Sequence, residues 1–149
     1  MNSDGIIKSL NQLTPNQVAL WGKMTTQHMV EHLILALKMS NGKLSLKCFN
    51  SPEKIPALKR FLLSEKPLPK LFENPALGKG LSALEYRSLD EALEKLKVEI
   101  DDYHLYFKKN PDSRTVNVTF GELNKYEWDV FHHKHFKHHL SQFGLKYSK

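Results

Sequence analysis

The sequence has little that would place the protein in a membrane or outside the cell. It contains a single cysteine, Cys48, which cannot form an internal disulfide and suits a reducing compartment. No stretch approaches the roughly 18 to 20 apolar residues of a membrane-spanning helix, and the opening residues lack the apolar segment of a signal peptide. We therefore expect a cytoplasmic protein that has no membrane partner.

The sequence also lacks a concentrated basic patch. Its formal net charge is +6, and a basic protein can bind nucleic acid through the phosphates. The lysines, however, are spread from Lys8 to Lys149 with acidic residues between most of them, and no basic run is interleaved with aromatic side chains. This distribution argues against a nucleic-acid partner.

Hydrophobic periodicity and helix-capping signals predict an all-α protein. At 149 residues and 40% hydrophobic content the chain has the size of one domain, so we expect a single domain over residues 1–149. Ser88 with Glu91, and Asn124 with Glu127, form capping-box patterns at two helix starts. The predicted helices run over about Ser3–Leu13, Thr25–Ser40, Pro52–Ser64, Ser88 to a residue before Pro111, and Asn124 to Gly144.

Residues 41–87 form a long, proline-containing connection between two of the long helices. A structureless loop of this length is uncommon in a compact domain, which is why a short helix is expected within it. A connection that long also lets the helices on its two sides run parallel. The pattern therefore favours a four-helix bundle with a long crossover between the second and third bundle helices.

Five of the eight histidines lie close together near the C-terminus, and their spacing carries the strongest chemical signal. An α-helix turns about 100° per residue, so His135 and His139 lie within about 20° of Trp128 on the face that we expect to be buried. On the first long helix, His28 and His32 share one stripe in the same way. Two histidines four residues apart can reach one ion at about 2.0 to 2.1 Å, and a third from a facing helix leaves the fourth tetrahedral corner open for water or a substrate atom.

The histidine pattern alone leaves a second interpretation open, in which these side chains are solvated or hydrogen-bonded within the structure. Burying imidazoles without partners costs free energy, so two inward-facing pairs favour a ligand role. Ligand imidazoles must be deprotonated, and metal affinity is therefore expected to fall as the pH drops below about 6.5.

Three segments give the chain a family resemblance: WGKMTTQHMVEHL at 21–33, FGEL at 120–123 and HFKHHLSQFG at 135–144. The sequence resembles the DinB/YfiT-like superfamily, in a branch classed as a domain of unknown function. The resemblance implies a four-helix bundle with a parallel middle pair and a three-histidine site for a divalent transition metal, zinc or nickel. It places the ligands at His32, His135 and His139.

The sequence departs from that branch at two places. Asn117, Val118 and Thr119 stand where relatives usually carry a His-Pro pair, so any role of that histidine is absent or moved. His28 stands where relatives usually carry glutamine, a residue that is not a ligand. We therefore expect His28 to support the site from beside a ligand, while a role as a fourth ligand that closes a structural site stays open.

Several other residues lie near the predicted site or on the same helix face. His132 and Gln142 are close to the ligand pair, and Gln142 either orients a ligand histidine or packs at the helix end. His104 is either near the site or a partly exposed structural residue. Trp21 and Trp128 are expected in the core.

The resemblance also carries an expectation about activity. Characterised relatives are thiol transferases and a thiol-dependent isomerase that use bacillithiol, mycothiol or glutathione, and some members are described as metal-dependent hydrolases. A metal-dependent hydrolase or thiol transferase acting on a small molecule, with a low-molecular-weight thiol as a candidate partner, is therefore implied. The alternative is a non-catalytic protein whose ion stabilises the bundle. No catalytic residue is assigned, and a homodimer stays open.

The entrance to the site is expected where the 41–87 connection and the 111–123 turn approach the helices, because loops rather than packed helices admit a substrate. Neither the tract around Phe72 and Tyr86 nor Phe120 offers a fixed anion clamp. This favours a small, partly apolar electrophile over a phosphorylated one.

Overall fold

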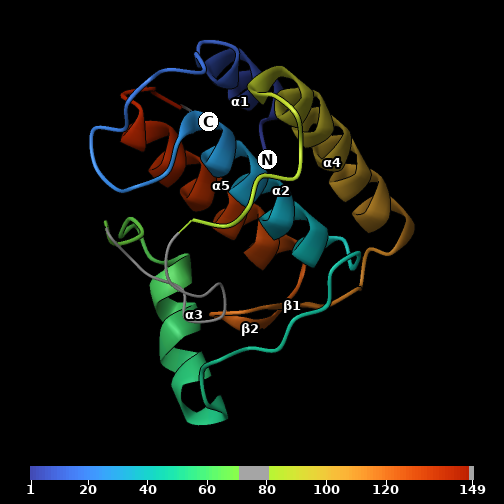
Figure 1. The fold of residues 1–149 in the computed structure, drawn as a ribbon. Helices are drawn as coiled ribbons and strands as arrows, with labels where there is room; N and C mark the ends of the chain where they lie inside the picture. The colour runs from blue at the N-terminus through green and yellow to red at the C-terminus, as the bar shows by residue number, and fades with distance from the viewer. Residues whose placement is uncertain (71–80, 148–149) are drawn as a thin grey trace.

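The computed structural model describes residues 1–70 and 81–147, and these residues are mostly helical (Figure 1). In chain order the elements are α1 (Ser3–Leu10), α2 (Thr26–Ser40), a short 3-10 helix η1 (Pro52–Lys54), α3 (Ile55–Leu63), α4 (Leu89–Lys109), β1 (Thr115–Asn117), β2 (Gly121–Leu123) and α5 (Lys125–Gln142). The helical expectation is confirmed, with one small antiparallel hairpin added to it. Phe72 lies outside the described residues.

The helix starts fall where the capping signals predicted them. The Ser88 side chain accepts a hydrogen bond from Glu91 N–H at the start of α4. At α5 both halves of the capping box are formed, between Asn124 and Glu127. Helix α1 ends at Leu10, earlier than predicted, because residues 11–13 continue in tight turns.

The β1–β2 hairpin lies within residues 111–123, which the sequence predicted only as a turn. Thr115 pairs with Leu123 and Asn117 pairs with Gly121. The Asn117 side chain closes the turn by accepting hydrogen bonds from the backbone N–H groups of Thr119 and Phe120. β-branched residues suit extended backbone, but strands of three residues are too short to give a clear alternating pattern.

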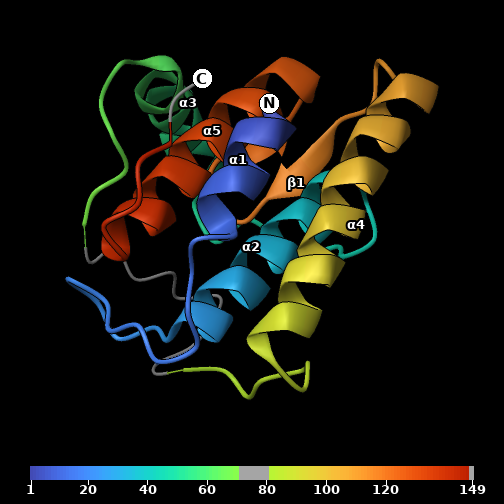
Figure 2. The ribbon, with the colours of Figure 1, turned by 90° about the horizontal axis from the view of Figure 1, so that it is seen from above.

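Helices α2 and α4 pack side by side and run in the same direction, while α5 runs against α2 in the opposite direction (Figures 1 and 2). The parallel arrangement of α2 and α4 matches what the long connection between them predicted. Helix α1 contacts both α4 and α5. Every one of these four helices thus faces two others, and their apolar sides meet in a common core.

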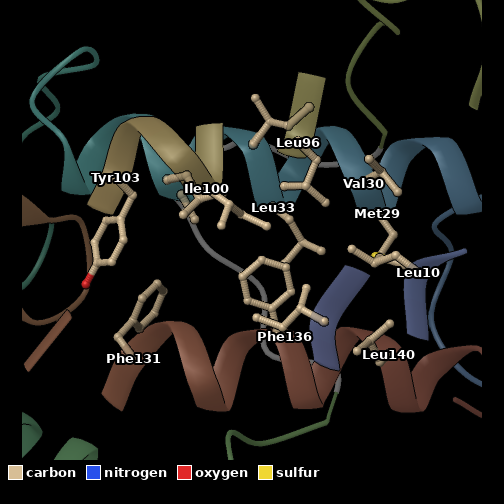
Figure 3. Close-up of a cluster of buried hydrophobic side chains, with 14 of the residues drawn as sticks. Leu10, Met29, Val30, Leu33, Leu96, Ile100, Tyr103, Phe131, Phe136 and Leu140 are labelled. Carbon is tan, nitrogen blue, oxygen red and sulfur yellow. The ribbon is translucent and has the colours of Figure 1, made fainter. Parts of the chain in front are cut away.

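The core is built from one apolar stripe of each helix (Figure 3). Leu33 of α2 is 1% exposed, and Ile100 of α4 and Phe136 of α5 are fully buried. Burying a side chain of this size stabilises the fold by roughly 1.5 to 3 kcal/mol. Leu33 and Phe136 each directly follow a predicted metal ligand in the sequence, so the packing of α2 and α5 into this core also positions those ligands.

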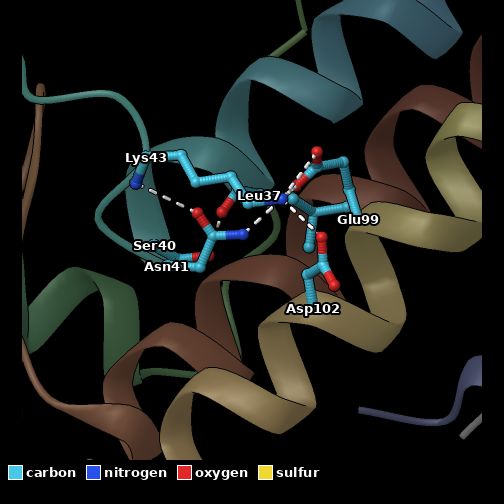
Figure 4. A network of polar contacts seen from close by, with 6 residues as sticks. All are labelled: Leu37, Ser40, Asn41, Lys43, Glu99 and Asp102. Atoms are coloured by element: carbon cyan, nitrogen blue, oxygen red, sulfur yellow. Dashed lines mark hydrogen bonds and ion pairs between the residues drawn. The ribbon is translucent and has the colours of Figure 1, made fainter.

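Two polar clusters hold the ends of the helices. At the end of α2, Asn41 donates to the buried Glu99 carboxylate of α4, and the Lys43 ammonium lies between Glu99 and Asp102 (Figure 4). On α5, the Lys134 ammonium donates to three backbone carbonyls at and beyond the end of α3. These contacts fix α2 to α4 and α3 to α5.

No helix among the described residues has both the length and the apolar character that a bilayer-spanning segment requires.

Candidate metal centre

Three imidazoles from two helices meet in the interior. His32 comes from α2, and His135 and His139 come from α5, one helical turn apart. The Nε2 atom of His135 lies 3.0 Å from Nε2 of His32 and 3.0 Å from Nε2 of His139. The candidate ligand atoms of the three residues all lie within 4.8 Å of one another.

The spacing of these nitrogens suits a small metal ion. Three imidazole nitrogens at about 2.0 to 2.1 Å from one tetrahedral ion lie about 3.3 Å apart, which is close to the 3.0 Å from Nε2 of His135 to Nε2 of His32 and of His139. Imidazole is a ligand that favours zinc, nickel, copper and iron over magnesium or calcium. The donor set therefore fits a divalent transition metal bound by three nitrogens.

The same three imidazoles are held in the form that binds metals. Burial, with a smaller contribution from the charge of His138, lowers the pKa of His32 to about 4. Burial and the neighbouring imidazoles hold the pKa values of His135 and His139 well below 6.5. All three side chains are therefore neutral at pH 7, and a neutral imidazole offers the lone pair that an ion needs.

Gln142 contacts one of the three directly. The Nδ1–H of His139 donates to Oε1 of Gln142 across 2.7 Å. With its proton on Nδ1, the His139 ring presents an Nε2 lone pair to His32 and His135. This contact agrees with the first of the two roles considered for Gln142, which is to orient a ligand histidine. The Nδ1 of His135 has no comparable partner among residues 1–70 and 81–147.

The rim of the cluster contains aromatic side chains, of which the helix periodicity placed Phe131 beside the ligand pair but did not place His138 or Trp21 there. Phe131 stacks on His135 with ring centroids 4.9 Å apart. His138 lies edge-on to His139 at 4.9 Å and to Trp21 at 4.8 Å. Trp21 is half-buried rather than a core residue. The one sequence signal for His138 is its position three residues after His135, on the adjoining flank of the helix.

His28 and His104 do not join the cluster. The Nδ1 of His28 lies 2.6 Å from the Thr25 hydroxyl, and its Nε2 lies 3.0 Å from the backbone carbonyl of Ser82. Both ring nitrogens are thus engaged outside the three-histidine group. The Nε2 of His104, on α4, lies 2.9 Å from the Ser3 hydroxyl of α1.

His132 and Trp128 lie in the core, one turn from the cluster. The Nε2–H of His132 donates to the Ser40 hydroxyl across 2.9 Å, and the ring stacks on Trp128 with centroids 5.3 Å apart. Burial lowers the pKa of His132 to about 3. Trp128 is fully buried, and its Nε1–H donates to the hydroxyl of Thr115. These contacts make His132 a hydrogen-bonded core residue.

Access to the three histidines is narrow. His32 is half-buried, whereas His135 and His139 are 7% and 6% exposed. Two surface hollows of about 300 and 390 Å³ lie nearby, the first along residues 15–25 and the second beside Lys137, and neither lining includes a ligand candidate.

Parts of both predicted entrance segments approach the rim. His138 forms a hydrogen bond with the Leu68 backbone and lies close enough to Lys70 to be affected by its charge. Residues 68–70, at the end of the first described part of the connection, are therefore near the site. From the hairpin turn, Phe120 reaches Phe131 at a centroid distance of 6.1 Å.

Comparison of the chain with models of known protein families, with curated protein sequences and with solved structures finds no match. The resemblance to the DinB/YfiT-like superfamily thus rests on the sequence segments alone and stays a prediction.

Proposed function

We propose that this protein binds one divalent transition-metal ion, zinc or nickel, through Nε2 of His32, His135 and His139. The observation that carries the proposal is the convergence of three neutral imidazoles, two of them buried and one half-buried, with Nε2 separations of 3.0 Å around His135. Burying three imidazoles in mutual contact has a free-energy cost. A bound ion offsets that cost, because it is a partner for all three lone pairs at once.

The proposed fold is a four-helix bundle of the DinB/YfiT-like type made by α1, α2, α4 and α5, with the crossover between α2 and α4. The packing of α1 on α4 and α5, and the parallel course of α2 and α4, support it. The proposed location is the cytoplasm, where Cys48, a free thiol, stays reduced.

Three protein ligands leave one coordination position open, which is the ligand count of a catalytic rather than a structural zinc site. An ion there supplies Lewis-acid chemistry and lowers the pKa of a water or thiol that it binds. The residues of the chain hold the ion, keep their own nitrogens unprotonated, and limit water through the rings of Phe131, His138 and Trp21. The proposed activity is metal-dependent hydrolysis, or transfer of a low-molecular-weight thiol to a small, partly apolar electrophile.

A non-catalytic role, in which the ion mainly stabilises the helices, is the second candidate. The observation that favours it is the burial of the cluster, with two of the three histidines less than 10% exposed and neither surface hollow reaching them. In this case the ion ties α2 to α5.

The test compares wild type with His135→Ala, each with and without added zinc or nickel. Elemental analysis of untagged wild type should give close to one equivalent of metal. Hydrolysis of an activated ester and consumption of a low-molecular-weight thiol with an electrophile are then measured in parallel. Activity that needs both the metal and His135 supports catalysis, whereas metal content without such activity supports the non-catalytic role. Absence of metal, with no uptake on titration, contradicts both.

A further inference from the structure

The loop at residues 14–25 docks on the last turn of α5, beside the histidine cluster. Leu20 N–H donates to the backbone carbonyl of Gln142 across 2.6 Å, and the Gln17 side chain donates to the carbonyl of Phe143 across 2.8 Å. The last carbonyls of a helix have no partner within the helix itself. The loop therefore supplies hydrogen bonds that the C-terminus of α5 needs.

The Gln142 side chain lies between this loop and the metal centre. Its Oε1 atom accepts the Nδ1–H of His139. On its other side, a Cβ placed on Gly22 would lie only 2.8 Å from Nε2 of Gln142. Gly22 also has φ +82°, in the left-handed region that favours glycine. The Gln142 amide is thus confined between a ligand ring and the backbone of the loop.

This arrangement bears on the state of His139. A neutral imidazole has one proton for two nitrogens, and a hydrogen-bond acceptor at Nδ1 keeps the proton there. Without that acceptor the proton can occupy Nε2, which faces His32 and His135 and is the atom an ion needs. Partners of this kind change metal affinity by about 10- to 100-fold where they have been removed.

We propose that Gln142 is a positioning residue for His139, and that the 14–25 loop holds Gln142 in place through the close approach of Gly22. Docking of the loop and binding of the metal are then coupled. Coupling between two equilibria is reciprocal, so metal binding also stabilises the docked loop. This inference rests on the metal centre proposed above.

The first experiment removes the acceptor and then restores it. Gln142→Leu keeps the bulk of the side chain but cannot accept the Nδ1–H, and it should weaken zinc binding by about 10- to 100-fold. Gln142→Glu keeps an acceptor oxygen and should bind zinc at least as tightly as wild type. Affinity is measured by competition with a chelating dye, so the result does not depend on any catalytic activity.

The second experiment uses a matched pair of glycines. Gly22→Ala adds a Cβ that collides with the Gln142 amide, whereas a Cβ on Gly42 would meet Tyr106 at an ordinary 3.7 Å. Gly22 and Gly42 have nearly the same φ, +82° and +77°, so alanine strains the backbone alike at both. Both variants should lose stability, but only Gly22→Ala should also lose zinc affinity. Zinc should slow hydrogen exchange at Leu20 N–H in wild type and in Gly42→Ala, and less in Gly22→Ala.

Equal zinc affinity of wild type and Gln142→Leu, or equal loss in the two glycine variants, would overturn the inference. If wild type binds no zinc, that result contradicts the proposed metal centre but does not test the role of Gln142. The role of Gln142 is then tested in metal-free protein by determining which ring nitrogen of His139 carries the proton. Nitrogen NMR should then find the proton on Nδ1 in wild type and shared between Nδ1 and Nε2 in Gln142→Leu. The same tautomer in both proteins would overturn the claim.

Discussion

Helix α5 presents two buried histidine environments one turn apart, and they differ in what the Nε2 atom faces. The Nε2 of His132 has a hydroxyl partner, Ser40, at 2.9 Å. The Nε2 of His135 faces two other Nε2 atoms at 3.0 Å, those of His32 and His139. Burial lowers the pKa at both positions. Burial and neutrality therefore do not separate a ligand from a structural histidine, whereas the partner of Nε2 does.

The largest expected effect of this difference is on metal content. Replacing His135 or His139 by alanine removes one of three ligands and should reduce the bound metal from about one equivalent to near zero. His132→Ala removes a core side chain with no ligand role and should keep close to one equivalent. Elemental analysis after dialysis against metal-free buffer measures all three variants side by side.

Retention of metal by His135→Ala would break the comparison, as would its loss in a folded His132→Ala protein. Circular dichroism on the same samples distinguishes a lost ligand from a lost fold.

The second effect is on the free energy of unfolding without metal, where His132→Ala should be more damaging than His135→Ala. His132→Ala deletes a fully buried ring, its stacking on Trp128 and its hydrogen bond to Ser40. Large-to-small changes of this kind cost about 2 to 4 kcal/mol of unfolding free energy. His135→Ala should cost less, because in the metal-free protein the Nε2 of His135 meets two other imidazole nitrogens rather than a hydroxyl. Urea unfolding with a chelator present measures both, and a greater loss for His135→Ala would reverse the assignment.

The third effect concerns pH. Burial, the largest cause in both cases, lowers the pKa of His32 to about 4 and that of His132 to about 3, against 6.5 in the unfolded chain. The unfolded state therefore binds more protons below pH 6.5, and the stability of the metal-free protein should fall as the pH drops from about 6.5 toward 4. Thermal unfolding from pH 8 to pH 4 checks this, and a flat profile over that range would contradict the burial of neutral imidazoles.

Zinc affinity should follow a different pH window. In the folded protein the ligand imidazoles stay neutral below pH 6.5, so binding should weaken at lower pH than the 6.5 expected from free histidine. His132→Gln, which removes the core imidazole, should reduce the pH dependence of stability and leave the pH dependence of zinc binding unchanged. Zinc binding that is lost already between pH 7 and 6 would instead indicate that the ligands titrate as exposed histidines.

The smallest expected effect is at His28, whose sequence position pointed to the site. Its ring nitrogens contact the Thr25 hydroxyl and the Ser82 carbonyl, so His28→Gln should leave zinc affinity nearly unchanged. The loss of zinc affinity in His139→Ala, measured by the same dye competition, shows how large the effect of removing a ligand is. A loss in His28→Gln that equals the loss in His139→Ala would indicate a four-histidine site.

What the sequence predicted well depends on local rules. The starts of α4 and α5 follow from caps at Ser88 and Asn124, and the shared direction of His135 and His139 follows from the helical turn. The position of His32 relative to them depends on how α2 packs against α5, which helix periodicity does not fix. The prediction of the three ligands therefore needed the family resemblance as well.

What the sequence missed depends on contacts between distant segments. His28 shares a helix stripe with His32, yet its ring is held by Ser82 from the far side of the long connection. Trp21 was predicted to be a core residue, because no local pattern in the sequence reveals that its loop docks on α5 beside His138. The hairpin at β1 and β2 was missed because strands of three residues leave no periodic signal.

The most direct test of the central claim is X-ray absorption at the metal edge of untagged protein loaded with one equivalent of zinc. Three converging Nε2 atoms predict a first shell of three imidazole nitrogens at about 2.0 Å plus one ligand that is not an imidazole, and two imidazoles in His32→Ala. A shell with fewer than three imidazoles in wild type, or the same shell in both proteins, would contradict the assignment of His32, His135 and His139 as the metal centre.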